Sequence, residues 1–189
     1  MVAQEDSLQQ KKKIILFLAI FCGSFIADIG TKVWARHNVK AQFVDRNTQE
    51  SFTLRFNLAF NEGVALGNFD DLPGRRIILS IIGILALGFV YYLFRRPESE
   101  NRLYLWGLAL VAGGALGNLA ERVYYGAVTD FVQFWGLKSV KITWPWPTFN
   151  VADIVLIVGV GLMLIYSFTA PVEDAPKGKN ANGKGTRKK

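Results

Sequence analysis

Cysteine and histidine are almost missing from this chain of 189 residues, which contains one of each, Cys22 and His37. A single cysteine excludes an intrachain disulfide and a cysteine-rich metal site. A lone histidine argues against a histidine-based zinc site. The sequence also lacks the His-Glu-x-x-His motif of metalloproteases and the Gly-x-Ser-x-Gly motif of many serine hydrolases. We therefore expect neither a metal ion nor another cofactor.

Charged residues are absent from long stretches of the chain, although a fifth of all residues are charged. Residues 77–94 and 103–120 are each 18 residues long without a formal charge, and 154–170 form a third such run. A fourth run, 14–27, extends to about residue 35 if it tolerates Asp28 and Lys32. A bilayer core about 30 Å thick needs roughly 20 apolar residues in helical form. The sequence thus predicts a mainly α-helical, polytopic membrane protein with four spans, at about 14–35, 77–94, 103–120 and 150–170.

The spans occupy a single membrane domain, 1–189, with polar ends. Residues 1–10 are polar and 171–189 are rich in Pro, Gly and Lys, which predicts two disordered tails. The formal charge of +7 would suggest nucleic acid in a soluble protein. Here the basic residues lie at span ends and in the tail, so membrane topology explains them better. We expect no nucleic-acid partner, and a monomer.

The distribution of basic residues predicts the orientation. Four spans place both termini on one side, and that side carries 12 of the 22 basic residues, in short segments: Lys11, Lys12, Lys13, Arg95, Arg96, Arg102, Lys177, Lys179, Lys184, Arg187, Lys188 and Lys189. This density favours cytoplasmic termini. Arg75 and Arg76, on the other side, argue against it.

The segment from about residue 38 to 71 is the only predicted loop large enough to form structure of its own. Apolar and mostly polar residues alternate from Phe52 to Phe60, which predicts a strand with one apolar face. Asn61-Glu62-Gly63 then predicts a turn, and Val64–Phe69 a possible return strand. The apolar face has two explanations, contact with the bilayer or a lipid-bearing ligand, or packing onto the protein's own spans.

Polar residues gather near one end of the predicted spans. Ionisable groups within a membrane cost on the order of 2.5–3.5 kcal/mol on insertion scales, so those that persist usually have a partner or a function. Four segments deliver such groups to the same predicted depth: Asp28 and Lys32, Asn118 and Arg122, Asp130, and Asn150 and Asp153. The members of each pair stand three or four residues apart and share a helical face. This convergence predicts a polar site at the outer membrane edge.

Structural roles also explain individual members of this set. Asp28 and Lys32 fit an intrahelical ion pair, and Asn150 and Asp153 fit a helix cap with an acid in the first turn. Asn118 and Arg122 fit a helix end anchored among lipid headgroups. The glycines at 113, 114 and 117 fit close packing between helices. Asp130 has no such local explanation, because its neighbours Val128, Thr129 and Phe131 offer it no charged partner.

Two aspartates from separate segments suit peptide hydrolysis. Repulsion between close carboxylates splits their apparent pKa values, so the pair holds one proton between them. The ionised member can accept a proton from an attacking water, and the protonated member can polarise the scissile carbonyl and then protonate the leaving amine. Asp130 and Asp153 are accordingly the candidate catalytic pair of an aspartic endopeptidase.

The motifs resemble those of the signal peptidase II family, the lipoprotein signal peptidases, from about residue 14 to 166. They are DIGTK at 28–32, NEGVALG at 61–67, GGALGNLAER at 113–122, VTDF at 128–131 and FNVAD at 149–153. The resemblance implies four helices with a small periplasmic β-cradle between helices 1 and 2. It also implies cleavage of diacylglyceryl-modified prolipoproteins just before the lipidated cysteine.

Carried over position by position, the resemblance implies that Asp130 and Asp153 are catalytic. It implies substrate-binding or supporting roles for a further set: Asn61, Gly63, Asn118, Arg122, Asn150, Asp28 and Lys32. Arg122 and the asparagines would hold carbonyls of the substrate backbone, whereas Asp28 and Lys32 would support the site without taking part in the chemistry. Glu121 departs from the family, which more often has Asp at this position.

Two functions of other classes compete with this one. A non-catalytic membrane module would use the polar residues as a lipid- or substrate-binding site, but a transport pathway needs charges nearer the middle of the membrane. A lipoprotein precursor is imitated by the basic residues 11–13, the apolar run after them and Cys22. The bulky Phe21 directly before that cysteine, and the three further spans, argue against it.

Overall fold

The computed structural model describes residues 2–41, 53–63, 74–135 and 147–170. Its elements follow one another as α1 (Val2–Asn38), β1 (Thr53–Asn61), α2 (Arg75–Phe94), the short 3-10 helix η2 (Pro97–Glu100), α3 (Arg102–Tyr125), β2 (Val128–Trp135) and α4 (Val151–Thr169). The four α-helices are all long and apolar enough to cross a membrane. The predicted mainly helical fold with four spans is confirmed.

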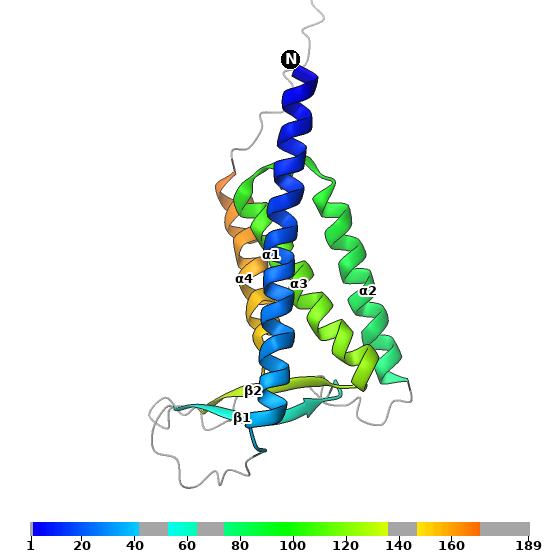
Figure 1. Ribbon diagram of the computed structural model, residues 1–189, viewed down its shortest axis with the longest axis vertical. Coiled ribbons are helices and arrows are strands. Elements are labelled where there is room, and N and C mark those ends of the chain that lie inside the picture. The colour runs from blue at the N-terminus through cyan, green and yellow to red at the C-terminus, as the bar shows by residue number, and fades with distance from the viewer. Residues whose placement is uncertain (1, 42–52, 64–73, 136–146, 171–189) are drawn as a thin grey trace, which may run out of the picture.

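Helix α1 begins at Val2, where the sequence predicted a disordered tail over 1–10. Figure 1 shows this end of α1 projecting beyond the other three helices. The difference has a simple cause. Gln, Glu, Leu and Lys are good helix formers, and a span that is already helical removes the costly nucleation step for the residues that precede it. The predicted tail over 171–189 lies outside the described residues.

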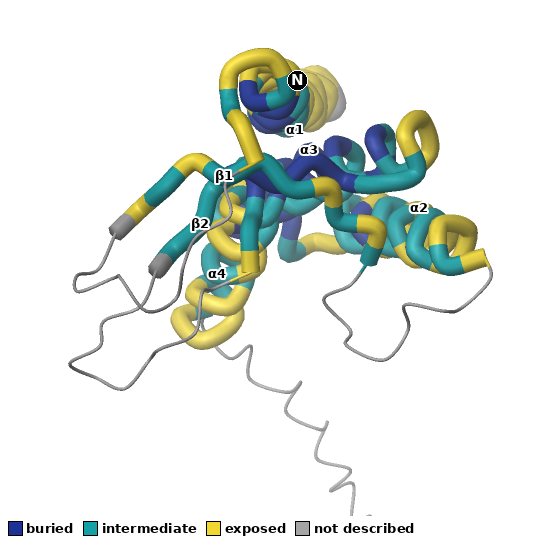
Figure 2. The backbone as a smooth tube through the Cα atoms, turned by 90° about the horizontal axis from the view of Figure 1, so that it is seen from below, coloured by how far each residue is buried: buried dark blue, intermediate teal, exposed yellow. Residues whose placement is uncertain are grey.

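Helix α3 is the centre of the bundle and contacts each of the other three helices. Figure 2 shows most of the buried backbone along it. Glycines allow the close approach, as predicted. A Cβ on Gly114 would stand 2.7 Å from the carbonyl oxygen of Ala152 in α4, and a Cβ on Gly113 or Gly117 would collide with the side chains of Ser24 or Asp28 in α1. Small residues serve membrane helices in this way because backbones can then pack closely.

The two strands form one antiparallel sheet across the end of the bundle opposite the N-terminus, here called the sheet end (Figure 1). The predicted strand is therefore confirmed as β1. Its partner β2 comes from between α3 and α4, where the sequence analysis predicted no strand. The proposed return strand Val64–Phe69 lies outside the described residues. The sheet thus joins two segments that are far apart in the sequence.

The apolar side chains of β1 divide between the two environments that the sequence left open. Phe56 packs edge-on against Trp34 of α1, with ring centroids 5.5 Å apart, and both rings contact Phe131 of β2. Leu54, Phe56 and Phe60 are all more than half exposed. Strand β1 therefore contacts the bundle through Phe56 and still presents apolar surface at the sheet end.

The two arginines that argued against the predicted orientation have partners at the sheet end. Arg75 forms an ion pair of 2.9 Å with Glu62 in the turn after β1. Arg76 donates a hydrogen bond to the carbonyl of Val123, in the last turn of α3. A cation is favourable at that helix terminus because the free carbonyls carry partial negative charge. Contacts with neighbouring elements therefore explain the position of both arginines.

Candidate active site

Asp153 is fixed by the start of α4. Asn150 is the N-cap, and its Oδ1 accepts a hydrogen bond of 3.1 Å from the backbone N–H of Asp153. In return, Asp153 Oδ2 accepts one of 3.0 Å from the N–H of Asn150, which completes a capping box. The predicted capping role and the predicted place in a polar site are therefore two properties of the same residues.

Asp130 lies in β2, pairs with Ala59 of β1 and is only 1% exposed. Asn61, at the end of β1, donates from Nδ2 to Asp130 Oδ2 at 3.0 Å. The Oδ1 of Asn61 accepts the N–H of Gly63 at 2.8 Å, and Gly63 has a φ of 109°, a left-handed conformation that favours glycine. The turn after β1 thus orients the amide that binds Asp130.

A β-bulge places Asn61 on the correct face of the sheet. Up to Phe56 the register pairs even-numbered residues with even-numbered ones and odd with odd, as in Phe56 with Val132 and Arg55 with Gln133. The register then shifts, and Asn61 pairs with Val128. Side chains alternate between faces, so a shift by one residue moves Asn61 to the face of Val128 and Asp130. Strict alternation along β1 would have turned this amide away from the carboxylate.

Two asparagines connect the aspartates to each other. Asn150 Nδ2 donates to Asp130 Oδ1 at 2.6 Å, while the same residue caps Asp153. Asn118 of α3 donates from Nδ2 to Asp153 Oδ1 at 3.0 Å and accepts from Asn150 at 3.2 Å. Each of the four carboxylate oxygens of Asp130 and Asp153 therefore accepts a hydrogen bond from an amide N–H. The predicted polar cluster is brought together, and Asn61, Asn118 and Asn150 bind the aspartates directly.

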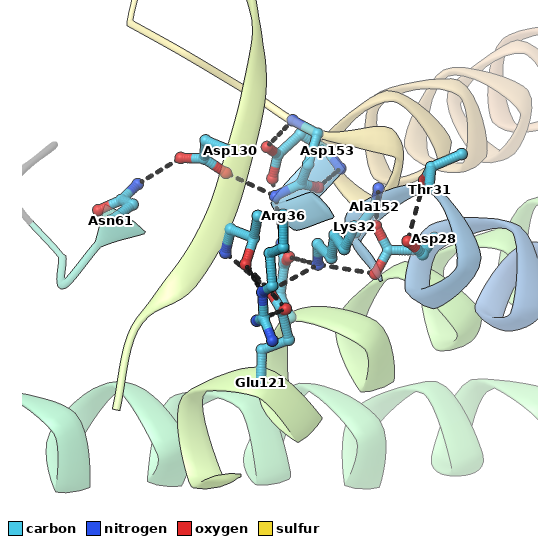
Figure 3. A network of polar contacts seen from close by, with 12 residues as sticks. Asp28, Thr31, Lys32, Arg36, Asn61, Glu121, Asp130, Ala152 and Asp153 are labelled. Carbon is cyan, nitrogen blue, oxygen red and sulfur yellow. Dashed lines mark hydrogen bonds and ion pairs between the residues drawn. The ribbon is translucent and has the colours of Figure 1, made fainter. Parts of the chain in front are cut away.

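A buried ion pair supports this cluster from α1 (Figure 3). Lys32 Nζ lies 2.7 Å from Asp28 Oδ2 and donates at the same distance to Asn118 Oδ1. Lys32 and Asp28 are 1% and 0% exposed. Asp28 Oδ1 also accepts the backbone N–H of Ala152 in α4 at 2.8 Å. The predicted intrahelical pair exists, and it reaches both α3 and α4.

Three residues of the network were not singled out from the sequence as members of the site. Glu121 of α3 accepts hydrogen bonds from the N–H and the hydroxyl of Thr129, at 2.7 and 2.9 Å, and forms an ion pair with Arg36 of α1. Arg36 Nε donates to the Thr129 hydroxyl at 2.8 Å. A signal for Arg36 was available, because it follows Lys32 by four residues, as Lys32 follows Asp28, and so shares their helical face.

Arg122 differs from the rest of the predicted set. Its guanidinium is near enough to interact electrostatically with both Asp130 and Asp153. Its Nε is buried and has no hydrogen-bond partner among the described residues. A buried donor without a partner costs about 1–3 kcal/mol, which is a reason to expect a ligand there. Arg122 thus has a donor, its Nε–H, that no described residue uses.

The electrostatics of the site favour a shared proton. The pKa of Asp130 is raised to about 6, first because burial disfavours the charged carboxylate and also because Asp153 carries a charge nearby. Hydrogen bonds from Asn61 and Asn150, and the charge of Lys32, act in the opposite direction. A carboxyl group whose pKa lies near neutral pH can hold a proton and transfer it when a second carboxylate is beside it. General acid–base catalysis requires both abilities.

Metal ligation is not favoured by the same groups. Among the described residues, no three His, Cys, Asp or Glu side chains are grouped as metal ligands would be. The oxygens of Asp130 and Asp153 already face N–H donors, which a cation would have to displace. The arrangement is suited to activating water with two carboxylates.

Comparison with known proteins agrees with this geometry. The family model described as signal peptidase (SPase) II matches residues 20–169, a range that contains Asp28, Asp130, Asp153 and the asparagines around them. A lipoprotein signal peptidase of Dichelobacter nodosus is 36% identical over 157 residues, covering 82% of this chain and 94% of that protein. Another, from Aquifex aeolicus, is 33% identical over 166 residues, covering 85% and 91%.

Solved structures show the same fold. A bacterial membrane enzyme determined by the in meso method at 1.9 Å superposes with a TM-score of 0.66 and 27% identity, covering 82% of this chain and 94% of its own. A second one, determined at 2.3 Å, gives a TM-score of 0.63 and 25% identity, covering 90% and 94%. With its four spans, its paired aspartates and relatives that align over most of their length, the chain belongs to the signal peptidase II family of aspartic peptidases.

Proposed function

We propose that Asp130 and Asp153 are the catalytic dyad with which this peptidase removes signal peptides from diacylglyceryl-modified prolipoproteins, by hydrolysing the bond before the lipidated cysteine. The observation that carries the proposal is that Asn150 binds both carboxylates, through its side chain to Asp130 and through its cap to Asp153. A structural helix cap needs only the second contact. The first contact brings a buried carboxylate from another segment to the same place.

The chemistry follows from one proton shared by two carboxylates. The ionised aspartate accepts a proton from water as the water oxygen attacks the scissile carbonyl carbon. The protonated aspartate donates a hydrogen bond to the carbonyl oxygen, where negative charge develops. Collapse of the tetrahedral intermediate breaks the C–N bond, and the dyad delivers a proton to the departing amine. One water is consumed and the dyad again holds one proton.

Arg122 would bind the substrate backbone in this scheme. Its buried Nε–H has no partner among the described residues, and its charge lies near both aspartates. A peptide carbonyl is a suitable acceptor for that donor. The asparagines hold the carboxylates in the structure, so we assign them to the orientation of the dyad.

The site lies at one membrane edge, which suits a substrate anchored by lipid. The dyad lies in β2 and at the start of α4, at the sheet end of the spans (Figures 1 and 3), and β1 of the same sheet carries the exposed apolar side chains Leu54 and Phe60. We assign the protein to the bacterial inner membrane, with both termini cytoplasmic and the dyad at the periplasmic face, because basic residues are denser at the opposite end.

A reporter fused after Lys189 that is active only outside the cytoplasm should therefore be inactive, and activity would reverse the assignment. Within the described residues one chain brings the groups of the site together, so we also propose a monomer, and we propose no nucleic-acid partner because membrane topology explains the basic residues.

A matched pair of precursors tests the substrate. Purified protein in detergent is given one prolipoprotein either with or without diacylglyceryl on its cysteine. We expect cleavage of the modified form only, with the new N-terminus at the modified cysteine as determined by mass spectrometry. Equal cleavage of both forms would show that the protein does not recognise the lipid on the precursor, which would contradict this part of the proposal. Binding of the modified form without any cleavage would instead support the non-catalytic lipid-binding module.

The pH dependence of the reaction tests the shared proton. The pKa of Asp130, about 6, is set with Asp153 charged nearby, so it describes loss of the last proton of the dyad. The value of kcat/KM should fall as pH rises through this step. Asn61 donates a hydrogen bond that favours the charged carboxylate, so an Asn61→Ala substitution should raise the pKa and move the alkaline limb to higher pH. A limb that stays in place or moves to lower pH would contradict this account.

A further inference from the structure

The residue immediately before each dyad aspartate is held in the same way. The backbone N–H of Ala152, which precedes Asp153, donates to Asp28 Oδ1 at 2.8 Å. The backbone N–H of Thr129, which precedes Asp130, donates to Glu121 Oε2 at 2.7 Å. Both accepting residues are buried, since Asp28 is 0% exposed and Glu121 is 4% exposed. Two carboxylates that lie outside the dyad therefore fix the backbone next to it.

Lys32 connects these two carboxylates (Figure 3). Its Nζ lies 2.7 Å from Asp28 Oδ2 and 3.6 Å from Glu121 Oε2. The side chain of Lys32 is 1% exposed, so water does not screen these contacts. One buried cation therefore links the carboxylate that holds the α4 side of the dyad with the carboxylate that holds the β2 side.

The second oxygen of Glu121 is fixed from two directions. Oε1 accepts the hydroxyl of Thr129 at 2.9 Å and forms an ion pair with Arg36. Arg36 Nε also donates to that hydroxyl at 2.8 Å, and its guanidinium lies 3.7 Å from the ring centroid of Tyr125. Glu121 consequently has one orientation, in which one oxygen faces the backbone of β2 and the other faces α1.

Helix packing alone does not explain this arrangement. A buried ion pair contributes little net stability compared with apolar residues of similar volume, because desolvation of the charges opposes their attraction. The chain also ties α1 to the α2–α3 connection at the other end of the bundle, through Lys13 and Glu100 at 2.6 Å. No backbone N–H of a dyad neighbour takes part in that pair. Apolar residues could join the helices, but they could not accept the N–H groups of Ala152 and Thr129.

We propose that Asp28 and Glu121, bridged by Lys32, are positioning carboxylates that set the separation and orientation of Asp130 and Asp153. This inference rests on the proposed dyad and adds Glu121 and Arg36 to the residues on which the reaction depends. Asp28 and Glu121 do not touch the substrate in this account, but act through the backbone of Ala152 and Thr129. Such a role has a measurable effect, because a displacement of about 1 Å in a catalytic group can lower the rate about a hundred-fold.

The first test is a Glu121→Gln substitution in the full-length protein, assayed with a diacylglyceryl-modified precursor. Glutamine keeps the shape of the side chain but has one acceptor oxygen, so its NH2 group must face either the Thr129 N–H or Arg36. We expect kcat to fall about ten- to hundred-fold with KM changed less than about two-fold, because binding is kept and alignment is lost. Glu100→Gln is the matched control, since it removes an interhelical ion pair at the other end of the bundle, and it should leave kcat unchanged.

The second test is a double-variant cycle with Asp28→Asn. Both substitutions act on the geometry of one dyad, so the combined loss of kcat should be smaller than the product of the single losses. Losses that multiply independently would overturn the proposal, as would a Glu121→Gln enzyme whose kcat per folded molecule equals that of the control.

If Glu121→Gln does not fold, Thr129→Val removes only the hydroxyl and should lower kcat several-fold at constant KM, and an unchanged kcat would again overturn the proposal. Retained activity in an Asp130→Asn enzyme would instead contradict the proposed dyad.

Discussion

Replacement of either Asp130 or Asp153 by asparagine is expected to lower kcat/KM for a diacylglyceryl-modified precursor by about a hundred- to ten-thousand-fold, because a positioned general acid or base contributes on the order of 10²–10⁴-fold. Asparagine keeps the size of each side chain but cannot accept or release the proton. The two residues act as one unit, so the double variant should be about as inactive as each single variant. Cleavage is measured with purified, folded enzyme.

The control for this pair is Glu62→Gln, which neutralises an exposed carboxylate next to Asn61 in the same outer segment. It should retain activity within about two-fold, since an exposed ion pair contributes only about 0–1 kcal/mol. The inactive variants should still accumulate in membranes and bind the uncleaved precursor, because Arg122 and the exposed apolar side chains of the spans and of β1 are unchanged. Substantial cleavage by the Asp130→Asn enzyme would refute the assignment of the dyad.

The spans could be predicted because lipid imposes a strong requirement on sequence. Hydrocarbon accepts few charges, so the long uncharged stretches mark α2, α3 and α4 clearly. Helix α1 was harder to delimit, because Asp28 and Lys32 interrupt its apolar run. The structure shows why they are tolerated, since each is a buried partner of the other. The convergence of polar residues on one membrane depth was visible for the same reason.

The parts that could not be predicted depend on tertiary contacts without a local signature. Strand β1 shows an alternating pattern, but the bulge after Phe56 is invisible in it, and this bulge decides which face Asn61 occupies. Glu121 looks like an ordinary charge at a helix end. Its importance comes from Arg36, 85 residues earlier, and from Thr129 in a strand that the sequence analysis did not predict. The sequence singled out Asp130, Asp153, Asp28 and Lys32 as polar residues near the membrane, whereas the contacts of Glu121 with Arg36 and Thr129 required the fold.

A Lys32→Met substitution is expected to be the most destabilising single change at the site. Lys32 is 1% exposed and donates to Asp28 Oδ2 and Asn118 Oδ1, both at 2.7 Å. Removal of one partner of a buried ion pair costs about 3–5 kcal/mol, because the remaining charge is left buried without compensation. Among the described residues, the Asp28 carboxylate would keep only the N–H of Ala152 as a hydrogen-bond donor. We expect a clear fall in the midpoint of thermal unfolding in detergent, together with loss of activity.

Lys13→Met is the matched control for this change, because Lys13 is also a lysine of α1 in an interhelical ion pair, but its partner Glu100 is 60% exposed. Water can solvate the remaining carboxylate there, so the cost should stay below about 1 kcal/mol. A second substitution separates charge from packing. Asp28→Asn in the Lys32→Met background removes the uncompensated charge while its side-chain oxygen can still accept the N–H of Ala152, so the double variant should be more stable than Lys32→Met alone. Equal stability of these two variants would mean that the buried charge is not the cause, and that Lys32 acts through its volume.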